Sequence, residues 1–521
     1  MTAGAAWRVL PASLAGALKH RRELAERQRL AERLVDGDAS LWRSPEEAAT
    51  RLGWLQLPKT MEQEAPALRE FATEIATEGV RDVVVMGMGG SSLAPEVFER
   101  LLGGQPGRPR LTVLDSTHPA LVRAHLEAFP PASSLYVVAS KSGTTIETLS
   151  FLRTFWDQAA DAGAGRRFVA ITDPESALAS LAGERGFRRL FLAPPDVGGR
   201  YSALSPFGLV PAALIGVDPR VLLTAAQAML EQPEEAVDLG LLLGEAVLAG
   251  RDKLTFFADA ELEPILPWIE QLLAESTGKR GTGLVPVFGE PDGVVYGPDR
   301  LFVRLSLAGK APSGWSGDEQ LVAAGHPCAE LQWPDVGVVG AEMMRWEIAA
   351  AVAGAVLGVQ PFDQPDVDLA KRLARAAMGD RAGPGADDPL TVDADDPVAL
   401  QAAMGPWLEG AAAGDYIALQ AFLPPAEEVL TSIGMLRSNL AATGLPTTLG
   451  FGPRFLHSTG QLHKGGPEGV FCLQLIDRGG EDLEVPEAGF GYRELIDAQA
   501  LGDARALAKR GRRVLRVWLG D

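Results

Sequence analysis

Short apolar runs alternate along the chain with longer segments in which charged and apolar residues are mixed. The apolar runs lie at residues 83–86, 111–114, 135–139, 167–171 and 190–192, and segments such as 94–102 and 146–159 separate them. A short run of apolar, often β-branched residues is typical of a strand buried on both faces. Their alternation with helical segments predicts an α/β fold built on a doubly wound parallel sheet.

The same alternation starts again further along the chain. A second cycle has strand-like runs at 253–258, near 285 and at 301–307, with helical segments at 264–275 and 341–357. A third cycle contains strand-like runs at 415–422 and 470–475 and a helical segment at 427–441. We therefore expect two doubly wound parallel-sheet domains and a smaller C-terminal α/β unit.

The segments outside these cycles set the expected boundaries. Leucines are interleaved with charges from residue 11 to residue 47, which is typical of amphipathic helix. Residues 378–396 are rich in Gly, Pro and Asp, as surface linkers are. The predicted division is an N-terminal helical arm at 1–60, a first domain at 61–235, a second at 236–378 and the C-terminal unit at 379–521.

The charge balance limits the class of partner. The chain has 48 Lys and Arg against 68 Asp and Glu, a formal net charge of −20. Such a field repels DNA, RNA and anionic membrane surfaces, so we expect neither nucleic acid nor membrane as a partner. A phosphorylated small molecule is also repelled at long range, and a site for one must concentrate hydrogen-bond donors locally.

Cysteine content and the N-terminus point to a reducing compartment. Cys328 and Cys472 are too few for a disulfide framework or a zinc cluster, and no spacing typical of a metal site occurs. The N-terminal residues lack the pattern of a signal peptide, and nowhere do about 18 apolar residues run together. We expect a cytoplasmic protein that does not depend on a metal.

The first candidate loop is Gly87-Met88-Gly89-Gly90-Ser91-Ser92, between the strand at 83–86 and a helix expected to begin at 93–95. Glycines let backbone amides approach an anion closely, and a helix N-terminus adds partial positive charge. The loop is a candidate phosphate or sugar site. A dinucleotide site is the alternative, because Asp115 follows the next strand, although Ser92 replaces the last glycine of that fingerprint.

The second candidate loop is Ser140-Lys141-Ser142-Gly143-Thr144-Thr145, after the strand at 135–139 and before a helix at Ile146. Its four hydroxyls, lysine and glycine at a helix N-terminus are typical of a nest for a phosphate dianion. Helix capping is the alternative, but it accounts for only one or two of the hydroxyls.

Both loops, with the residues around them, resemble the signature loops of the phosphoglucose isomerase family, whose domains have the sugar isomerase (SIS) fold. Three further motifs resemble that family's in the same order, and they are Val197-Gly198-Gly199-Arg200-Tyr201-Ser202, Ala274-Glu275-Ser276-Thr277-Gly278-Lys279 and the stretch from Pro361 to Lys371.

The resemblance implies an aldose–ketose isomerase acting on a sugar phosphate, with glucose 6-phosphate and fructose 6-phosphate as the expected pair. This reaction needs no redox cofactor, because it only moves protons within the sugar. Glu275 is then the base that moves a proton between C2 and C1, Arg200 holds the charge of the enediolate, and Lys371 assists ring opening. The alternative for Arg200 is a structural role, in which it pairs with an acid such as Asp196. The remaining implied substrate-binding residues are Gly90, Ser91, Ser140, Lys141, Ser142, Thr144 and Thr145.

The chain departs from the family at the histidine. Family members place a ring-opening histidine a few tens of residues after the base, across a dimer interface, whereas the next histidine after Glu275 is His326. His457 and His463 lie in one segment rich in donors and glycines, and we hypothesise that one of them supplies the missing acid/base group, in this chain or from a neighbouring subunit. The alternative is a structural loop held by imidazole hydrogen bonds. His118, after the second strand, is a candidate on the substrate side.

Three segments, at residues 445–453, 455–466 and 501–519, resemble the C-terminal part of the isomerase half of fused transaldolase–glucose-6-phosphate isomerase proteins. A transaldolase domain needs roughly 250 residues, so we expect none before Met1. The resemblance also implies a homodimer. Two other functions remain open: a non-catalytic sugar-phosphate sensor of the same fold, and an isomerase that also accepts mannose 6-phosphate.

Overall fold

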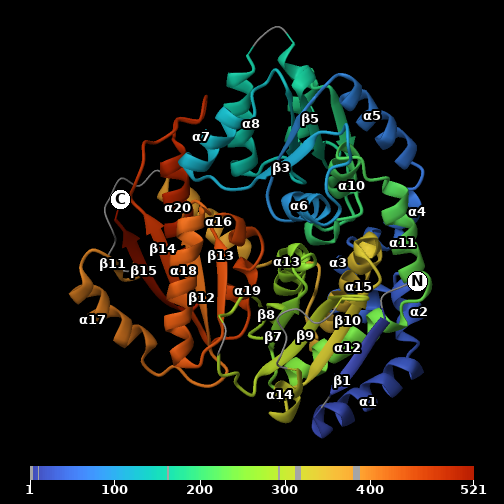
Figure 1. Ribbon diagram of the computed structural model, residues 1–521, viewed down its shortest axis with the longest axis vertical. Helices are drawn as coiled ribbons and strands as arrows, with labels where there is room; N and C mark the ends of the chain where they lie inside the picture. Colours follow the sequence, from blue (N-terminus) through green and yellow to red (C-terminus); the bar gives the residue numbers. More distant parts are fainter. Residues whose placement is uncertain are drawn as a thin grey trace.

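The computed structural model of the protein describes residues 4–9, 11–160, 163–291, 294–310, 318–378 and 388–520. Within these ranges the strands form three five-stranded sheets. In Figure 1 the three sheets, with their helices, form three lobes arranged around a shared centre. The α/β architecture predicted from the alternation of strands and helices is confirmed.

The first sheet has the order β3-β2-β4-β5-β6, and all its strands are parallel. Alternate residues of β2 enter different cores: Val83 and Val85 pack with α5, α6 and α10, whereas Val84 and Met86 pack with α7, α8 and α9. Burial on both faces explains the continuous apolar runs. The elements are α5 (Ala65–Thr77), β2 (Asp82–Gly87), α6 (Gly90–Leu102), β3 (Arg110–Leu114), α7 (Pro119–Ala128), β4 (Ser134–Ala139), α8 (Ile146–Gln158), β5 (Phe168–Thr172), α9 (Ala177–Glu184), β6 (Arg189–Leu192) and α10 (Pro206–Leu214).

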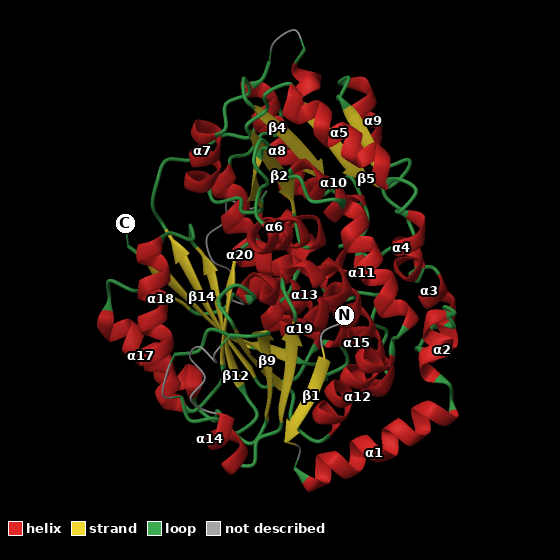
Figure 2. Ribbon diagram, turned by 45° about the vertical axis from the view of Figure 1, so that its right-hand side comes forward, coloured by secondary structure: helices red, strands yellow, loops and turns green. Residues whose placement is uncertain are grey.

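The second sheet has the order β1-β10-β9-β7-β8. Its strands are parallel except β1, which pairs antiparallel with β10 at one edge. The helices α11, α12, α13 and α15 pack on it or on one another (Figure 2). The elements are β1 (Gly4–Val9), α11 (Pro219–Glu231), α12 (Glu234–Leu248), β7 (Lys253–Ala258), α13 (Leu266–Thr277), β8 (Val285–Val287), β9 (Arg300–Leu307), α14 (Asp318–Ala323), β10 (Cys328–Trp333) and α15 (Val339–Leu357).

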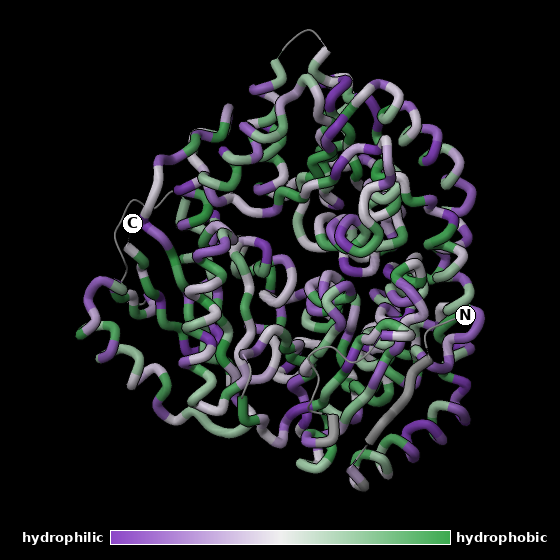
Figure 3. Tube along the Cα trace, in the orientation of Figure 1, coloured by the Kyte–Doolittle hydropathy of each residue, from purple (hydrophilic) through white to green (hydrophobic). Residues whose placement is uncertain are grey.

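The N-terminal arm differs from the expectation at its start. Helices α1 (Ala12–Arg27), α2 (Leu30–Val35), α3 (Pro45–Ala49) and α4 (Leu57–Thr60) follow the predicted pattern, but β1 precedes them as a strand. Its start, Gly4-Ala5-Ala6-Trp7, contains no β-branched residue, and the ladder with β10, rather than local propensity, makes it extended. In Figure 3, α1 lies at the margin and alternates between hydrophilic and hydrophobic colours, as an amphipathic surface helix does.

The third sheet has the order β11-β15-β14-β12-β13, with all strands parallel. It has five strands, as each of the other two sheets does, whereas a smaller unit was expected. Helix α16 precedes the predicted boundary at residue 378 but packs against α20 of this unit, and residues 379–387 of the predicted linker lie outside the described ranges. The elements are α16 (Val367–Ala377), β11 (Thr391–Asp393), α17 (Pro397–Leu408), β12 (Tyr416–Phe422), α18 (Glu427–Leu440), β13 (Thr447–Phe451), α19 (Gly460–Gly465), β14 (Val470–Asp477), α20 (Tyr492–Lys509) and β15 (Arg513–Leu519).

The three units meet where α6, α13, α16 and the 3-10 helix η8 (Arg454–His457) come together. Ligands of open parallel sheets bind outside the carboxyl ends of the strands, and the loops after β2 and β4 open toward this meeting point. Among the described helices, none is both long and apolar enough to cross a membrane.

Candidate active site

A cavity of about 430 Å³ lies between the three units. Its wall includes the loops after β2 and β4, the 3-10 turn that carries Arg200, helix α13, helix α16 and η8. Most of the predicted site residues line it, and these are Gly90, Ser91, Ser140, Lys141, Ser142, Thr144, Thr145, Arg200, Glu275 and His457. The structure therefore brings together residues from distant parts of the chain.

The loop at 140–145 holds its hydroxyls at the N-terminus of α8. Ser140 Oγ lies 2.9 Å from Thr145 Oγ1, and Ser142 Oγ lies 3.0 Å from Thr144 Oγ1. Thr145 occupies the N-cap position but makes no side-chain capping hydrogen bond, so capping does not account for these hydroxyls. Gly143 has a φ of +67°, and a Cβ there would stand 2.6 Å from the backbone nitrogen of Leu178, so the turn requires glycine.

Two cations lie at this end of the cavity. Lys141 Nζ is 2.5 Å from Asp173 Oδ2 and donates to the carbonyl of Pro195 at 3.1 Å, so a carboxylate balances its charge. Arg51 also lines the cavity, and its guanidinium donates to the same carbonyl at 3.3 Å. Sequence reasoning missed Arg51, because one arginine among the many charges of the N-terminal arm carries no local signal.

The glycine-rich loop after β2 is a packing surface for two other segments of the site. A Cβ at Gly90 would stand 1.9 Å from the carbonyl oxygen of Gly199, and one at Gly89 would stand 2.8 Å from that of His457. Helix α6 begins at Gly90, one turn earlier than predicted, so Gly90 and Ser91 belong to its first turn. Asp115, the acidic residue of the dinucleotide alternative, does not line this cavity.

Glu275 and Arg200 form a buried pair. Arg200 Nη1 lies 3.5 Å from Glu275 Oε2, and the two side chains are 3% and 6% exposed. The guanidinium is fixed by hydrogen bonds to Ser276 Oγ at 2.9 Å and to the carbonyl of Asp363 at 2.8 Å, and it pairs with Glu275 rather than with Asp196. Burial raises the pKa of Glu275, and the positive charge of Arg200 opposes that rise.

His457 reaches the cavity from the C-terminal unit of the same chain. Its Nε2 lies 2.9 Å from Oε1 of Glu147, which begins α8 beside the hydroxyl loop. Glu147 also accepts a hydrogen bond from Gln499 Nε2 at 2.6 Å. Gln271 Nε2 donates to the carbonyl of His457 at 2.7 Å and lies 3.3 Å from Glu275 Oε2. The sequence analysis assigned no role to Glu147, Gln271 or Gln499, all of which line the cavity.

His463 does not line this cavity, so of the two histidines only His457 is placed where the hypothesis needs an acid/base group. The ring of His463 is buried, lies outside the lining of the cavity, and has Nδ1 3.2 Å from Gln420 Nε2. Burial lowers its pKa to about 3, which keeps the imidazole neutral. His118 is likewise elsewhere, because it caps α7 and its Nε2 lies 2.9 Å from Asp477 Oδ2.

Lys371 lies in α16, and its side chain is outside the part of the chain that the structure describes. Three other residues of this helix, Val367, Ala370 and Ala374, line the cavity. Gln364, just before the helix, lines it as well and accepts a hydrogen bond from Arg200 Nη1 at 3.4 Å.

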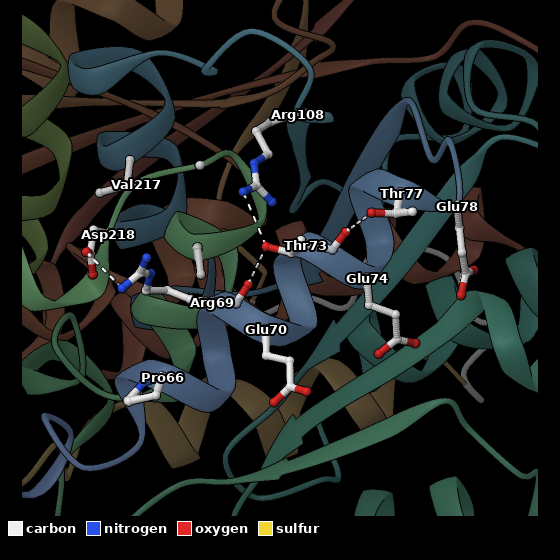
Figure 4. Close-up of a pocket in the computed structure, with 12 residues that line it drawn as sticks. Pro66, Arg69, Glu70, Thr73, Glu74, Thr77, Glu78, Arg108, Val217 and Asp218 are labelled. Atoms are coloured by element: carbon white, nitrogen blue, oxygen red, sulfur yellow. Dashed lines mark hydrogen bonds and ion pairs between the residues drawn. The ribbon is translucent and has the colours of Figure 1, made fainter.

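A wider hollow of about 840 Å³ lies over α5 on the outer surface (Figure 4). Its charged groups are engaged with neighbouring groups: Arg69 lies 3.6 Å from Asp218, and Arg108 donates to the carbonyl of Ala72 at 2.8 Å. Glu74 and Glu78 both accept hydrogen bonds from Arg188. The hollow thus offers no converging set of unused donors, and within the described residues no group of His, Cys, Asp and Glu is arranged to hold a metal ion.

Comparisons with known proteins agree with the geometry of the cavity. The family model for phosphoglucose isomerase matches residues 62–282. A glucose-6-phosphate isomerase of Rubrobacter xylanophilus is 31% identical, with 63% of this chain and 89% of that protein covered. One of Thermus thermophilus is also 31% identical, with 64% of this chain and 91% of that protein covered.

Two solved structures have a similar fold. The crystal structure of a hypothetical protein from Thermus thermophilus is 27% identical, covers 71% of this chain and all of its own, and has a TM-score of 0.59. That of a glucose-6-phosphate isomerase from Chlamydia trachomatis covers 72% of this chain and 88% of its own, with a TM-score of 0.55 at 21% identity. The chain belongs to the phosphoglucose isomerase family, and it is an aldose–ketose isomerase.

Proposed function

We propose that this protein interconverts glucose 6-phosphate and fructose 6-phosphate in the cavity described above. The observation that carries the proposal is that the hydroxyl loop at 140–145 and the buried carboxyl of Glu275 line one cavity. A phosphate bound at one end then places the sugar carbons toward the other. The relatives named as glucose-6-phosphate isomerases supply the choice of sugar.

The phosphate is bound by neutral donors and two cations. The hydroxyls of Ser140, Ser142, Thr144 and Thr145 and the N-terminus of α8 donate to its oxygens. Because Asp173 balances Lys141, Arg51 contributes the less compensated positive charge. This local concentration of donors offsets the repulsion from a chain of net charge −20.

The ring opens before the proton moves. His457, held by Glu147 through its Nε2, exchanges a proton with the ring oxygen or the adjacent hydroxyl, and by resemblance to the family Lys371 assists from α16. Since His457 reaches the cavity within one chain, we propose that a homodimer, which the resemblance implies, is not required to deliver this histidine.

The isomerisation itself is a proton transfer by Glu275. The carboxylate removes the proton from C2 of the open-chain aldose and returns it to C1. The proton of the C2 hydroxyl passes to the C1 oxygen, so that C1 carries a hydroxyl and C2 becomes the carbonyl. Arg200 holds the negative charge of the enediolate between these steps, and its fixed guanidinium needs no rearrangement to do so. Burial of both groups excludes water from the intermediate.

The test is turnover of fructose 6-phosphate, with the glucose 6-phosphate formed oxidised by a coupled dehydrogenase. Glu275→Gln should lower kcat by at least about 10³-fold, because the base is removed while the volume is kept. The matched control is Glu263→Gln, an exposed residue just before α13, which should leave kcat unchanged.

Two results would contradict the proposal. Equal rates for the parent and Glu275→Gln would remove the assigned base. A parent protein that binds fructose 6-phosphate without turning it over would favour the sugar-phosphate sensor. A separate measurement with mannose 6-phosphate tests the second alternative, because turnover at a similar rate would extend the substrates to the C2 epimer.

A further inference from the structure

A second cavity of about 430 Å³ lies behind the active-site cavity, between α6, α13 and the C-terminal unit. The two cavities share walls. In η8, Arg454 and Phe455 line the second cavity, whereas Leu456 and His457 line the first. Helix α13 is divided in the same way, with Glu270 on the second cavity and Gln271 and Glu275 on the first.

The carboxyl of Glu270 is a buried group without a partner. Its residue is 8% exposed, and among the described residues no side chain or backbone group forms a hydrogen bond or ion pair with it. Burial raises the pKa of Glu270 to about 8, so at neutral pH the group is mainly protonated and carries a hydrogen to donate.

Arg437 is a buried cation on the same cavity. Its residue is 7% exposed, and its hydrogen bonds go to neutral acceptors: Thr447 Oγ1 at 3.1 Å, the carbonyl of Thr447 at 2.7 Å and that of Phe288 at 3.0 Å. Within the described residues it forms no ion pair with a carboxylate, and burial lowers its pKa. Arg454, a partly buried arginine on the same cavity, differs, because it pairs with Glu96 and with Asp115.

The rest of the wall is largely apolar. It includes side chains from both sides of the unit boundary, namely Leu93, Pro267, Phe288, Leu430, Phe451 and Phe455. A buried, unpaired cation and an unpartnered acid that open on an apolar cavity between units are the features of a small-molecule site.

We propose that this cavity binds a small organic carboxylate with an apolar body. The carboxylate accepts hydrogen bonds from the guanidinium of Arg437 and from the protonated carboxyl of Glu270, and the apolar body lies against the walls. One negative charge balances one buried cation, whereas a phosphate dianion would leave a buried charge unpaired. An α-amino acid is the competing occupant, since its ammonium group requires Glu270 to be ionised.

The site is placed to act on the proposed catalytic histidine. An occupant that contacts Arg454 or Phe455 contacts the same turn that holds His457 against Glu147. This consequence rests on the proposed function, whereas binding itself does not.

Calorimetry with 3-phenylpropionate tests the binding. For the parent protein at pH 6.5 we expect a Kd of about 1 mM, the range for a ligand of about ten heavy atoms. 3-Phenylpropanol, which lacks the charge, should bind at least about tenfold more weakly. Arg51→Ala, which alters only the active-site cavity, should leave the affinity unchanged and thereby locates the ligand.

The pH dependence identifies Glu270. Its loss of a proton near pH 8 should weaken binding to the parent about tenfold between pH 6.5 and pH 9. The other charged groups on this cavity are Glu96 and Arg100 from α6, Asp115 after β3, Arg437 from α18 and Arg454 from η8. Glu290 lies outside the cavity, where it pairs with Arg300, and its charge acts on Arg437. Glu270→Gln keeps a donor but cannot ionise, so its binding should not change with pH, while the surface variant Glu234→Gln should behave as the parent does.

Three outcomes would overturn the assignment. Absence of binding at pH 6.5 would contradict the site itself. A pH dependence that persists in Glu270→Gln would contradict the role of Glu270. Tighter binding of phenylalanine than of 3-phenylpropionate would show that the site binds a zwitterion and not a simple carboxylate. Turnover of fructose 6-phosphate at saturating 3-phenylpropionate is measured separately. We expect at least about a twofold change in kcat, and an unchanged kcat with bound ligand would contradict only the coupling to His457.

Discussion

The imidazole of His457 lies 2.9 Å from the carboxyl of Glu147, although 310 residues separate them along the chain. Glu147 begins α8 in the first unit, and His457 ends η8 in the C-terminal unit. The contact fixes the ring beside the hydroxyl loop, because an imidazole that donates to a carboxylate has a defined tautomer and orientation. The C-terminal unit therefore forms part of the wall of the candidate active site.

Removing the imidazole should slow the enzyme on ring-closed substrate. We expect His457→Ala to lower kcat by about 10²- to 10⁴-fold, the usual loss for a general acid/base. Glu147→Gln keeps the shape but weakens the orientation of the ring, and it should cause a smaller loss in the same direction. The measurement is the coupled assay with fructose 6-phosphate.

His463 provides the comparison, because it lies nearby in sequence but outside the cavity. His463→Gln should alter the melting temperature more than it alters kcat. A variant at His463 that loses activity as strongly as His457→Ala, with its fold intact by circular dichroism, would contradict the assignment.

Arg51 should act on substrate binding. It lines the cavity beside Lys141, whose charge Asp173 balances. We expect Arg51→Ala to raise the KM for fructose 6-phosphate about five- to tenfold with little change in kcat, since the phosphate is bound equally in the ground and transition states. The matched control is Arg43→Ala, an exposed arginine of the same arm, and an equal effect of both would assign the change to net charge alone.

The pH profile should report Glu275. The group acts as a base only when ionised, and burial raises its pKa above the ordinary value of 4.5. The kcat/KM of the parent should therefore fall as the pH drops through a value above 4.5. Arg200 lowers this pKa, so Arg200→Met should move the acidic limb to higher pH as well as lowering kcat.

A profile of Arg200→Met with its acidic limb at the parent's position would show that Glu275 does not set the limb. The second pKa of the substrate's phosphate is near 6, so ionisation of the substrate can also shape these profiles. Both profiles are therefore repeated with fructose 6-phosphate above and below its KM, because a limb set by the enzyme's own group does not depend on free substrate.

Glu347 should weaken the fold as the pH rises. It is fully buried in α15, and burial raises its pKa well above 4.5. Among the described residues, neither of its carboxyl oxygens has a hydrogen-bond partner. The folded protein keeps a proton that the unfolded chain releases above pH 4.5. The stability contributed by this group is thus present at low pH and declines by up to about 1.4 kcal/mol per pH unit as the pH rises, until the folded pKa is reached.

Glu347→Met removes the titrating group at nearly constant volume. We expect the free energy of unfolding to rise by about 1–3 kcal/mol at pH 8, with a smaller gain at pH 5, measured by urea denaturation. A gain that is the same at both pH values would mean that titration of Glu347 is not its source.

The sequence by itself determined the five strands of the first sheet and the two loops that we propose to bind the substrate. Runs such as 83–86 and 135–139 are apolar at every position because both faces of a parallel sheet are covered, and this is a local property of the chain. The loop at 140–145 was also predictable, because its donors and its glycine are consecutive residues at the start of a helix.

Only the tertiary structure decided which distant residues share the site. His457 and His463 are equivalent in sequence, but η8 turns the first toward the cavity and α19 buries the second, which is a consequence of packing rather than of pattern. Arg51 and β1 were missed for the same reason. The position of the N-terminal arm decides that Arg51 reaches the cavity, and pairing with β10 decides that residues 4–9 form a strand. Side-chain burial and contacts between units depend on the whole chain, so no window of sequence contains them.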